Sequence, residues 1–282
     1  MTLTAPPRLL LVHAHPDDES LWTGGTIARY AAAGAVVTLV TCTLGEEGEI
    51  IPPFLRQLGA AEADQLGGYR IGELRAACAA LGVSDHRYLG GAGRWRDSGM
   101  VDTAANEHPR AFVAGDPDVQ AGSLAEVLAE VDPQVVVTYA PDGGYGHPDH
   151  IRANQITIAA CAKRATVDRL YYAVTSARAT AAGLVRLATM AGLPYRLPAH
   201  GELPVTDDAE ITTRVPIAEV LPAKLAAMRA HATQISVWQH GDGGRCYALS
   251  NGIATPIVEE EYYVLALGGA TGAETDLFGG LG

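Results

Sequence analysis

Residues 9–19 read LLLVHAHPDDE, four consecutive aliphatic side chains followed directly by polar and charged ones. An all-apolar run of this length is typical of a strand buried on both faces, as in a parallel sheet covered by helices. The Ala-rich segment Leu21–Ala33 ends at Gly34, a residue that commonly ends helices, and the β-branched run Val36–Thr43 predicts a second strand. The stretch therefore predicts a β-α-β unit with a right-handed parallel crossover.

The same alternation continues along the chain, so we expect an α/β fold of Rossmann-like type. In this fold a mostly parallel sheet is flanked by helices, and here a smaller irregular C-terminal part would follow. Further strands are predicted at 87–89, 135–139, 170–174 and 262–265, and further helices at 73–81, 124–131, 151–163 and 221–232.

Two segments carry weaker signals. Residues 91–118 are rich in Gly, Asp, Asn and Pro and are expected to form a long loop region, which in a compact domain is usually functional. The Gly-rich tail, Gly268–Gly282, is expected to be partly disordered. We expect residues 1–175 to form the catalytic domain and residues 176–282 to pack on it as one integrated domain.

Composition limits the functional classes. The chain has 282 residues, 48% of them hydrophobic, which is enough for a sizeable buried core. Its net charge of −12 argues against nucleic acid as a main partner, because neutralising phosphates requires clustered Lys and Arg. It contains no run of five or more basic residues, so a polybasic membrane anchor is not expected either. Four widely spaced cysteines are typical of buried thiols in a cytoplasmic protein: Cys42, Cys78, Cys161 and Cys246.

Polar clusters follow two of the predicted strands at the point where each strand ends. The first is His13–Glu19, and the second, Pro141–His150, reads PDGGYGHPDH and follows strand 135–139. Because open α/β sheets bind ligands at the carboxyl ends of their strands, we expect the two clusters to meet at one edge. Pro16 and Pro148 fix φ at the start of the following helix, which holds the flanking His and Asp on a stiff turn.

The clusters contain the ligands of a metal site. His15 and Asp18 are three residues apart and can share one face of a helical turn, and His150 could complete a His-Asp-His set. Two imidazoles and one carboxylate, with a position left for water, is the composition of a catalytic zinc site. Asp17 would then lie beside the metal without binding it and could act as a general base. Asp149 could orient one of the histidines by contacting the ring nitrogen that does not face the metal.

Single residues of these clusters also have structural interpretations. A lone His at a strand end is more often a hydrogen-bonding residue, and Asp17 or Asp149 could be an acid at the start of a helix. The two clusters together favour a catalytic site over purely structural roles, because a structural interpretation has to explain each cluster independently. His13 is not expected to take part in the chemistry, and Glu19 is expected to be a helix-start acid.

Both clusters, Ala14–Glu19 and Gly143–His150, closely resemble the motifs of the LmbE-like (PIG-L) zinc deacetylases. Five further blocks extend the resemblance over most of the chain: Thr41–Glu49, Gly67–Leu74, Tyr88–Met100, Arg229–Gln234 and Tyr262–Leu265. The middle blocks resemble those of family members that act in mycothiol biosynthesis. The resemblance therefore implies zinc-dependent hydrolysis of the acetamide of N-acetylglucosaminyl-inositol, which yields free glucosaminyl-inositol and acetate.

The family pattern also implies a role for each site residue. His15, Asp18 and His150 would hold one zinc ion per chain. Asp17 would be the general base and His147 the general acid, with Asp149 as the partner that orients His147. Tyr145 would donate a hydrogen bond that polarises the acetyl carbonyl. A His-Asp-His site also accepts iron(II) or cobalt, so the ion itself stays open. Our candidates for contact with sugar or inositol hydroxyls are Arg70 and Asp97, then Glu49 and Met100, each with a solvated surface role as the alternative.

A related amidase that cleaves mycothiol S-conjugates shares these motifs and is the alternative function. It carries a Ser-Lys pair after its Asp-Asp-Glu, where this chain has Ser20-Leu21, and the difference favours the deacetylase. The acidic insert Asn106–Asp118 has no match in the family pattern.

Two other classes of protein also have to be weighed. The facial triad of non-haem iron oxygenases can take the form His15-x-Asp17 with His150, but those enzymes usually have an all-β scaffold. A zinc-stabilised sugar-binding module would need neither Asp17 nor His147. The oligomeric state is not indicated by the sequence.

Overall fold

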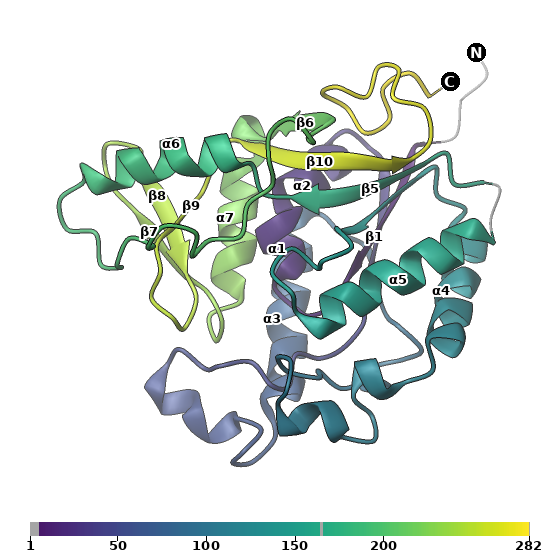
Figure 1. The fold of residues 1–282 in the computed structure, drawn as a ribbon, viewed down its shortest axis with the longest axis horizontal. Helices are drawn as coiled ribbons and strands as arrows, with labels where there is room; N and C mark the ends of the chain where they lie inside the picture. Colours follow the sequence, from purple (N-terminus) through teal and green to yellow (C-terminus); the bar gives the residue numbers. More distant parts are fainter. Residues whose placement is uncertain (1–5, 164–165, 282) are drawn as a thin grey trace.

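A mixed sheet of seven strands forms the centre of the computed structural model, which describes residues 6–163 and 166–281 (Figure 1). The strands are ordered β3-β2-β1-β4-β5-β10-β6. Their bounds are β1 Arg8–His13, β2 Val36–Thr41, β3 Asp85–Tyr88, β4 Val135–Tyr139, β5 Arg169–Val174, β6 Thr213–Pro216 and β10 Glu260–Leu267. Strands β1 to β5 pair in parallel, whereas β10 is antiparallel to both β5 and β6. The predicted fold class, a mostly parallel sheet flanked by helices, is confirmed.

Helices cover both faces of this sheet, which explains the all-apolar first strand. Leu9 and Leu11 pack on one side, against α2 (Gly24–Ala32), α3 (Leu66–Leu81) and α7 (Leu221–Ala230). Leu10 and Val12 pack on the other side, against α4 (Pro117–Val131) and α5 (Pro148–Ala162). All four side chains are fully buried, because successive residues of a strand point to opposite faces and both faces are covered here.

Residues after 175 contribute to two sheets. They supply β6 and β10 to the main sheet, and they form a smaller antiparallel sheet of β7 (Ser236–Gln239), β8 (Arg245–Ala248) and β9 (Thr255–Pro256). Helix α6 (Ala177–Ala188) lies beside the smaller sheet (Figure 1), and Leu187, Cys246 and Ala254 form a small core between them.

Several elements differ from their predicted bounds. The helix predicted at 21–33 is two helices, α1 (Asp18–Trp22) and α2, separated at Thr23. Helix α3 begins at Leu66, well before the predicted start at Glu73, because its early glycines hide the apolar periodicity. The predicted loop 91–118 contains two 3-10 helices, η2 (Ala104–Glu107) and η3 (Phe112–Ala114), before α4 begins.

The Gly-rich tail, for which partial disorder is expected, contacts the main sheet through hydrogen bonds from Arg169. The buried guanidinium of Arg169 donates hydrogen bonds to three carbonyls in the tail, those of Gly269 (2.8 Å), Thr271 (2.9 Å) and Leu277 (3.0 Å). The side chain of Leu277 is itself fully buried. The expectation considered glycine content alone, whereas the partner that satisfies these carbonyls lies about a hundred residues away in sequence. Gly282 lies outside the described residues.

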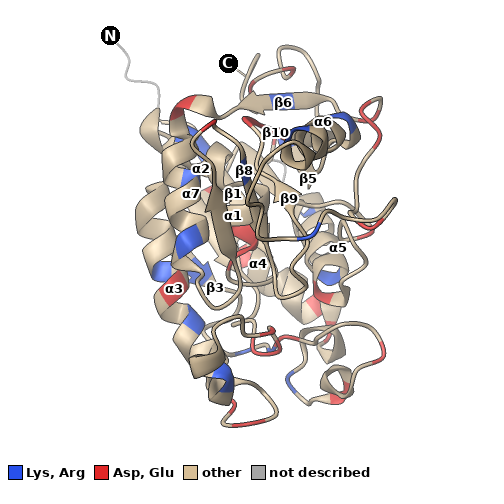
Figure 2. Cartoon of the chain, turned by 90° about the vertical axis from the view of Figure 1, so that its left-hand side faces the viewer, with Lys and Arg blue, Asp and Glu red and all other residues tan. Residues whose placement is uncertain are grey.

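Charged residues of both signs are spread along the chain. In Figure 2, Lys and Arg are interspersed with Asp and Glu. Within residues 6–163 and 166–281, no helix has the length and apolar character needed to cross a membrane.

Candidate metal-dependent active site

The two polar clusters meet at the point of the sheet where the strand order reverses. From β1 the chain continues outward through β2 and β3 on one side, and β4 and β5 lie on the other side. Because β1 and β4 are parallel neighbours, the residues that follow both strands emerge at the same edge. The ring nitrogens His15 Nδ1 and His150 Nε2, from the two clusters, are 3.3 Å apart.

Three buried atoms form an equilateral triangle there. His15 Nδ1, Asp18 Oδ2 and His150 Nε2 are separated by 3.3 Å along each edge. Metal–ligand bonds of about 2.0–2.1 Å in a tetrahedral zinc site imply edges of about 3.3–3.4 Å between ligand atoms. The donor set and its spacing therefore fit a tetrahedral metal ion with a fourth position left for another ligand.

Hydrogen bonds hold the candidate metal-binding atoms of His150 and Asp18 in the triangle. His150 Nδ1 lies 3.1 Å from the carbonyl of Gly143 and donates to it, which leaves Nε2 as the unprotonated nitrogen. The ring of Tyr139 stacks on His150 with 4.0 Å between centroids, and its hydroxyl donates to Asp18 Oδ2 at 2.7 Å. Gly143 has φ +69°, and a Cβ at this position would lie only 2.8 Å from the Cβ of His150, so the turn requires glycine.

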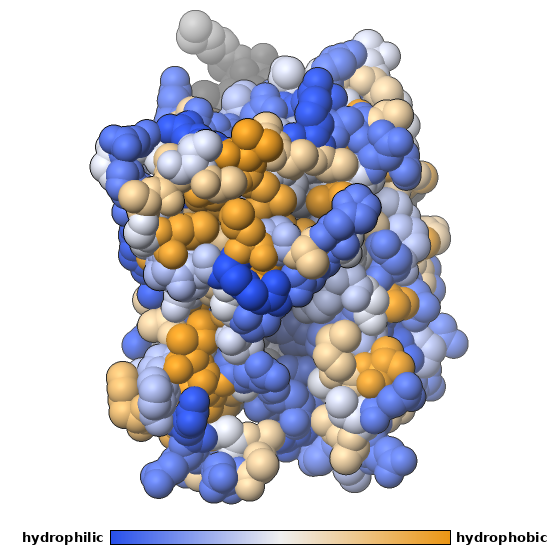
Figure 3. All heavy atoms as spheres, turned by 60° about the vertical axis from the view of Figure 1, so that its left-hand side comes forward, coloured by the Kyte–Doolittle hydropathy of each residue, from blue (hydrophilic) through white to orange (hydrophobic). Residues whose placement is uncertain are grey.

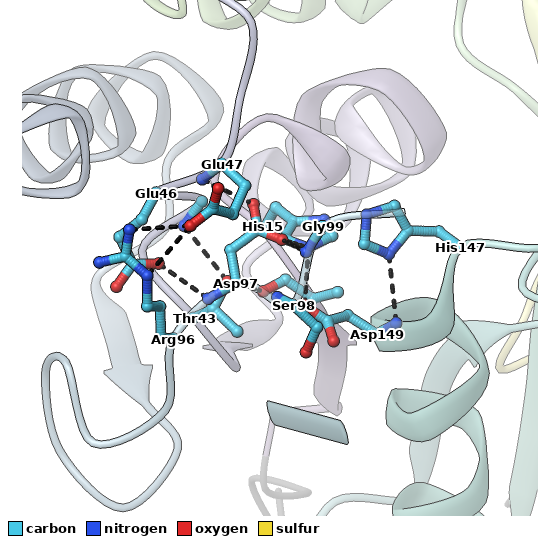
Figure 4. Close-up of polar contacts among 12 residues, drawn as sticks. His15, Thr43, Glu46, Glu47, Arg96, Asp97, Ser98, Gly99, His147 and Asp149 are labelled. Carbon is cyan, nitrogen blue, oxygen red and sulfur yellow. Dashed lines mark hydrogen bonds and ion pairs between the residues drawn. The ribbon is translucent and has the colours of Figure 1, made fainter. Parts of the chain in front are cut away.

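Two carboxylates hold the other nitrogen of His15. His15 Nε2 is 3.2 Å from Asp149 Oδ2 and 3.4 Å from Asp97 Oδ1 (Figure 4). A carboxylate at this position fixes the tautomer that presents Nδ1 to a metal. Asp149 Oδ2 also accepts the N–H of Ser98 at 2.9 Å, which ties the loop after β3 to the site.

This arrangement differs from the expected pairing of Asp149 with His147. His147 caps helix α5, and its Nδ1 accepts the main-chain N–H of Asp149 at 3.1 Å. The carboxylate of Asp149 instead contacts His15, so it orients a candidate ligand. The reason is local, because the first turn of α5 presents the N–H of Asp149 to the cap residue and buries its side chain under the loop at Ser98.

The cap also defines the state of His147. Since Nδ1 accepts a hydrogen bond, the proton of the neutral ring is on Nε2. Burial lowers the pKa of His147 to about 3. The role of His147 as general acid, implied by the family pattern, stays a prediction.

Two other groups of side chains also present atoms close enough together for a metal. One combines His147 with His15 and His150, and the other combines His15 with Asp97 and Asp149. In the first group the Nδ1 of His147 accepts the cap hydrogen bond, which leaves its Nε2 as the atom that could face a metal, and in the second both carboxylates face the Nε2 of His15. In the set containing Asp18, all three separations are 3.3 Å, which fits a tetrahedral site.

Asp17 lies beside the triangle in an unusual main-chain conformation. Its φ of 111° and ψ of −31° lie in a region that residues other than glycine rarely adopt. Its Oδ2 forms an ion pair with Nη2 of Arg70 at 3.0 Å. Burial raises the pKa of Asp17 to about 6, although the Arg70 guanidinium opposes the shift. Strained main-chain conformations of this kind gather at active sites, where the surroundings impose them.

The four candidate sugar contacts fall into two pairs. Arg70 and Asp97 are nearly fully buried and are engaged by the protein itself. Arg70 donates to the carbonyls of Gly45 and Pro16 as well as to Asp17, and Asp97 accepts the N–H of Gly99 at 2.8 Å beside His15. The structure thus shows both as supports of the site, and their contact with a sugar stays a prediction.

The second pair, Glu49 and Met100, lies on the exposed surface. Glu49 lines a pocket of about 380 Å³ between the loop 49–56 and the part of the chain that contains β7 and β8. Figure 3 shows this face hollowed in its centre, with hydrophobic side chains gathered above the hollow.

The insert Asn106–Asp118 braces the loop that carries Asp97 and Ser98. The side-chain amide of Asn106 donates to the carbonyl of Ser98, and the N–H of Val113 donates to Ser98 Oγ at 3.1 Å. Phe112, fully buried, anchors the insert in the core.

Sequence reasoning missed both Ser98 and Tyr139. Tyr139 could have been found, because it is the last residue of a predicted strand that leads directly into the second cluster.

Comparison with known proteins identifies relatives of this chain. The family model described as PIG-L, GlcNAc-PI de-N-acetylase, matches residues 10–161, which contain both clusters. A protein of Actinosynnema mirum named 1D-myo-inositol 2-acetamido-2-deoxy-alpha-D-glucopyranoside deacetylase is 70% identical over 282 residues, all of both chains. A protein of Saccharopolyspora erythraea with the same name, numbered 1, is 61% identical and covers 100% of this chain and 97% of that one.

Among solved structures, the fold is similar to that of N,N'-diacetylchitobiose deacetylase from Pyrococcus horikoshii. The TM-score is 0.51 at 20% sequence identity, covering 81% of this chain and 71% of the other. At that identity the likeness concerns the fold, whereas the match over residues 10–161 and the close relatives concern the family. The chain belongs to the PIG-L (GlcNAc-PI de-N-acetylase) family.

Proposed function

We propose that the chain is a metal-dependent deacetylase that hydrolyses the acetamide of N-acetylglucosaminyl-inositol to free glucosaminyl-inositol and acetate, in mycothiol biosynthesis. The observation that supports amide hydrolysis is the triangle of His15, Asp18 and His150 with the carboxylate of Asp17 beside it. The substrate class is supported by the relatives at 70% and 61% identity, both named as deacetylases of an inositol-linked acetamido sugar. The four cysteines are all free and buried, which supports a cytoplasmic location.

The proposed metal site consists of His15, Asp18 and His150 and holds one ion per chain. Two imidazole nitrogens and a carboxylate suit zinc, with iron(II) as the alternative. When bound, such an ion lowers the pKa of water and polarises a carbonyl oxygen.

Asp17 is the proposed base. Its carboxylate takes a proton from the attacking water, and we assign this proton to Oδ1 because Oδ2 faces Arg70. Burial raises the pKa of Asp17 to about 6, which makes the carboxylate a stronger base than an exposed aspartate while leaving it ionised near neutral pH.

The proton then has to reach the departing amine. Protonating His147 at Nδ1 would break its bond to the N–H of Asp149, so we propose that His147 donates a hydrogen bond from Nε2 to the reacting group. The proton that Asp17 takes from water is then the one that it returns to the amine nitrogen as the C–N bond breaks. This assignment replaces full acid catalysis by His147.

Tyr145 is the proposed donor to the carbonyl oxygen. Its half-exposed ring stands edge-on to His150 with 4.9 Å between centroids, on the open side of the cluster. A hydroxyl at this position can stabilise negative charge that develops on the carbonyl oxygen, a contact worth about 3–4 kcal/mol in other hydrolases.

The experiment that tests the function compares two substrates. Metal-loaded protein is incubated with N-acetylglucosaminyl-inositol and, separately, with a mycothiol S-conjugate, and the primary amine released from each is quantified. We expect faster release from the first. A preference for the conjugate would move the chain to the amidase function, and no release from either would contradict amide hydrolysis.

A further inference from the structure

One of the motifs shared with the family, Arg229–Gln234, has no role in the reaction proposed above. It begins in the last turn of α7 and continues into the segment that follows it. His231, from this motif, is fully buried, and its Nε2 lies 2.6 Å from Glu19 Oε1, which is also fully buried. A short contact between two fully buried ionisable side chains, 212 residues apart in sequence, calls for an explanation.

The carboxylate of Glu19 connects His231 to the main chain of Asp17. Glu19 Oε2 accepts the N–H of Asp17 at 2.9 Å, while Oε1 accepts the hydroxyl of Ser20 at 2.5 Å together with His231. Glu19 is therefore more than the helix-start acid expected from the sequence, because its side chain turns back to the residue before the helix.

Asp17 is the residue at which such a contact matters most. Its φ of 111° is a conformation that a residue with a side chain keeps only when the surroundings impose it. This φ sets the direction in which the Asp17 carboxylate leaves the main chain. A partner for the Asp17 N–H in this conformation therefore also fixes the position of the proposed base.

The same motif supports the other end of Asp17. Thr233 donates its N–H and its hydroxyl to the carboxylate of Glu73, at 2.8 Å and 2.7 Å. Glu73 lies three residues after Arg70 in α3, and Arg70 pairs with Asp17 Oδ2. Residues 231–233 thus contact both elements that hold Asp17, the start of α1 and helix α3.

We propose that Glu19 and His231 are positioning residues for Asp17. Glu19 holds the main chain of Asp17 in its positive-φ conformation, and His231 holds the carboxylate of Glu19. Neither residue contacts the substrate. The kinetic part of the proposal rests on the proposed function, so its test includes a structural measurement that does not.

The test uses two substitutions of His231 and a matched control. His231→Ala removes the donor to Glu19, whereas His231→Gln keeps an N–H at similar reach. The control is Lys224→Gln, because the pair Lys224–Glu261 resembles the pair His231–Glu19. Lys224 is buried and lies 2.6 Å from Glu261. The carboxylate of Glu261 in turn accepts the N–H groups of Gly25 and Thr26 at the start of α2. Lys224 lies on α7 as well, so this variant also controls for disturbance of that helix.

The measurements are kcat and KM for N-acetylglucosaminyl-inositol, bound metal per chain, and a crystal structure of each variant. A displaced catalytic group can cost about 100-fold in rate, so for His231→Ala we expect kcat to fall 10- to 100-fold. KM and metal content should be unchanged, and φ of Asp17 should leave the positive region. His231→Gln should recover most of the loss, and Lys224→Gln should leave kcat unchanged. In an Asp17→Asn background, His231→Ala should cause no further loss of kcat.

Several results would overturn the proposal. They are an unchanged kcat in His231→Ala, a loss explained by lost metal or raised KM, and an Asp17 φ that stays near its original value. If His231→Ala does not fold, Glu19→Gln is measured in the same way, because an amide has one acceptor oxygen and cannot accept both from the Asp17 N–H and from His231 as the carboxylate does. A wild-type protein that is inactive on the sugar would refute the proposed function, and the Asp17 conformation in the variant would still test the positioning.

Discussion

Two adjacent aspartates at the end of β1 have different environments. Asp18 contributes an oxygen to the triangle with His15 and His150. The positive-φ conformation of Asp17 directs its carboxylate toward Arg70 and not into the triangle. The difference comes from the main chain, because the helix begins at Asp18 and Asp17 is the residue before it. One motif therefore supplies both a candidate ligand and a candidate base.

The division between these two aspartates can be tested by Asp→Asn substitution at each position. Asp17→Asn keeps the size of the side chain and removes the base, so we expect bound metal to be unchanged and kcat to fall about 10²- to 10⁴-fold. Asp18→Asn, the matched variant, should lose metal instead. Metal content by mass spectrometry and acetate release are the measurements, and normal turnover of Asp17→Asn would show that it is not the base.

Substitutions of His147 distinguish a hydrogen-bond donor from a full proton donor. His147→Gln keeps an N–H near the position of Nε2, whereas His147→Ala does not. Because the cap at Nδ1 makes His147 a neutral donor, we expect the Gln variant to keep clearly more of the wild-type kcat than the Ala variant. Equal losses in the two variants would restore the acid role, and loss of bound metal would make His147 a ligand.

At the residue scale, the sequence predicted the contacts made within short motifs better than those made across the chain. His15, Asp18 and His150 could be chosen because each lies in a His-Pro-Asp cluster that follows a strand. The pairing of Asp149 with His15 was foreseen only as an option for one of the histidines. The contact of Glu19 with His231 could not be foreseen, because nothing near either residue in the sequence indicates the other.

Among the elements, α1 and α2 position the first cluster through close packing. Helix α2 approaches the segment after β6 so closely that a Cβ on Gly25 would lie 2.5 Å from the Cδ1 of Ile217. Glycine at this position therefore serves packing between elements. The sequence predicted one helix here, since the composition of 21–33 is uniformly helical and the break at Thr23 depends on tertiary contacts.

Replacing glycine by alanine in two helices should have opposite effects. Gly25→Ala overpacks the contact with Ile217 and should lower the free energy of unfolding by about 1–3 kcal/mol. Gly72→Ala is the control, because Gly72 is exposed on α3 with no atom within 4 Å of the added Cβ. It should raise the free energy of unfolding by about 0.5–1 kcal/mol through helix propensity. Urea denaturation measures both, and a neutral Gly25→Ala would contradict the packing argument.

For the molecule as a whole, the sheet is completed by segments from the end of the chain. The parallel strands β1, β2, β4 and β5 were predictable from local apolar runs and the helices between them, whereas the polar strand β3, which reads DHRY, was predicted only in part. The antiparallel insertion of β10 between β5 and β6 was not, because register and direction across such a distance depend on contacts that no local pattern records. The small sheet β7-β8-β9 was missed because its strands are only partly buried and short.

Arg169 attaches the tail to this sheet, and its removal should loosen the tail without disturbing the site. Arg169→Met leaves the carbonyls of Gly269 and Thr271 without their donor, at a cost of about 1–3 kcal/mol for each one that stays buried, whereas the carbonyl of Leu277 keeps the Tyr171 hydroxyl as a donor at 3.2 Å. We expect a lower Tm and faster hydrogen exchange in residues 269–277, with kcat of the folded protein unchanged. An unaltered Tm together with unaltered exchange would show that the tail is held by other contacts.

The most direct test of the central claim is a titration of metal-free protein with Zn²⁺, with acetate release from N-acetylglucosaminyl-inositol measured at each step. We expect no turnover without metal and full turnover at one equivalent per chain, and a variant lacking the His150 imidazole should not recover. Full turnover by the metal-free protein, or recovery only at two equivalents, would contradict a single metal held by His15, Asp18 and His150.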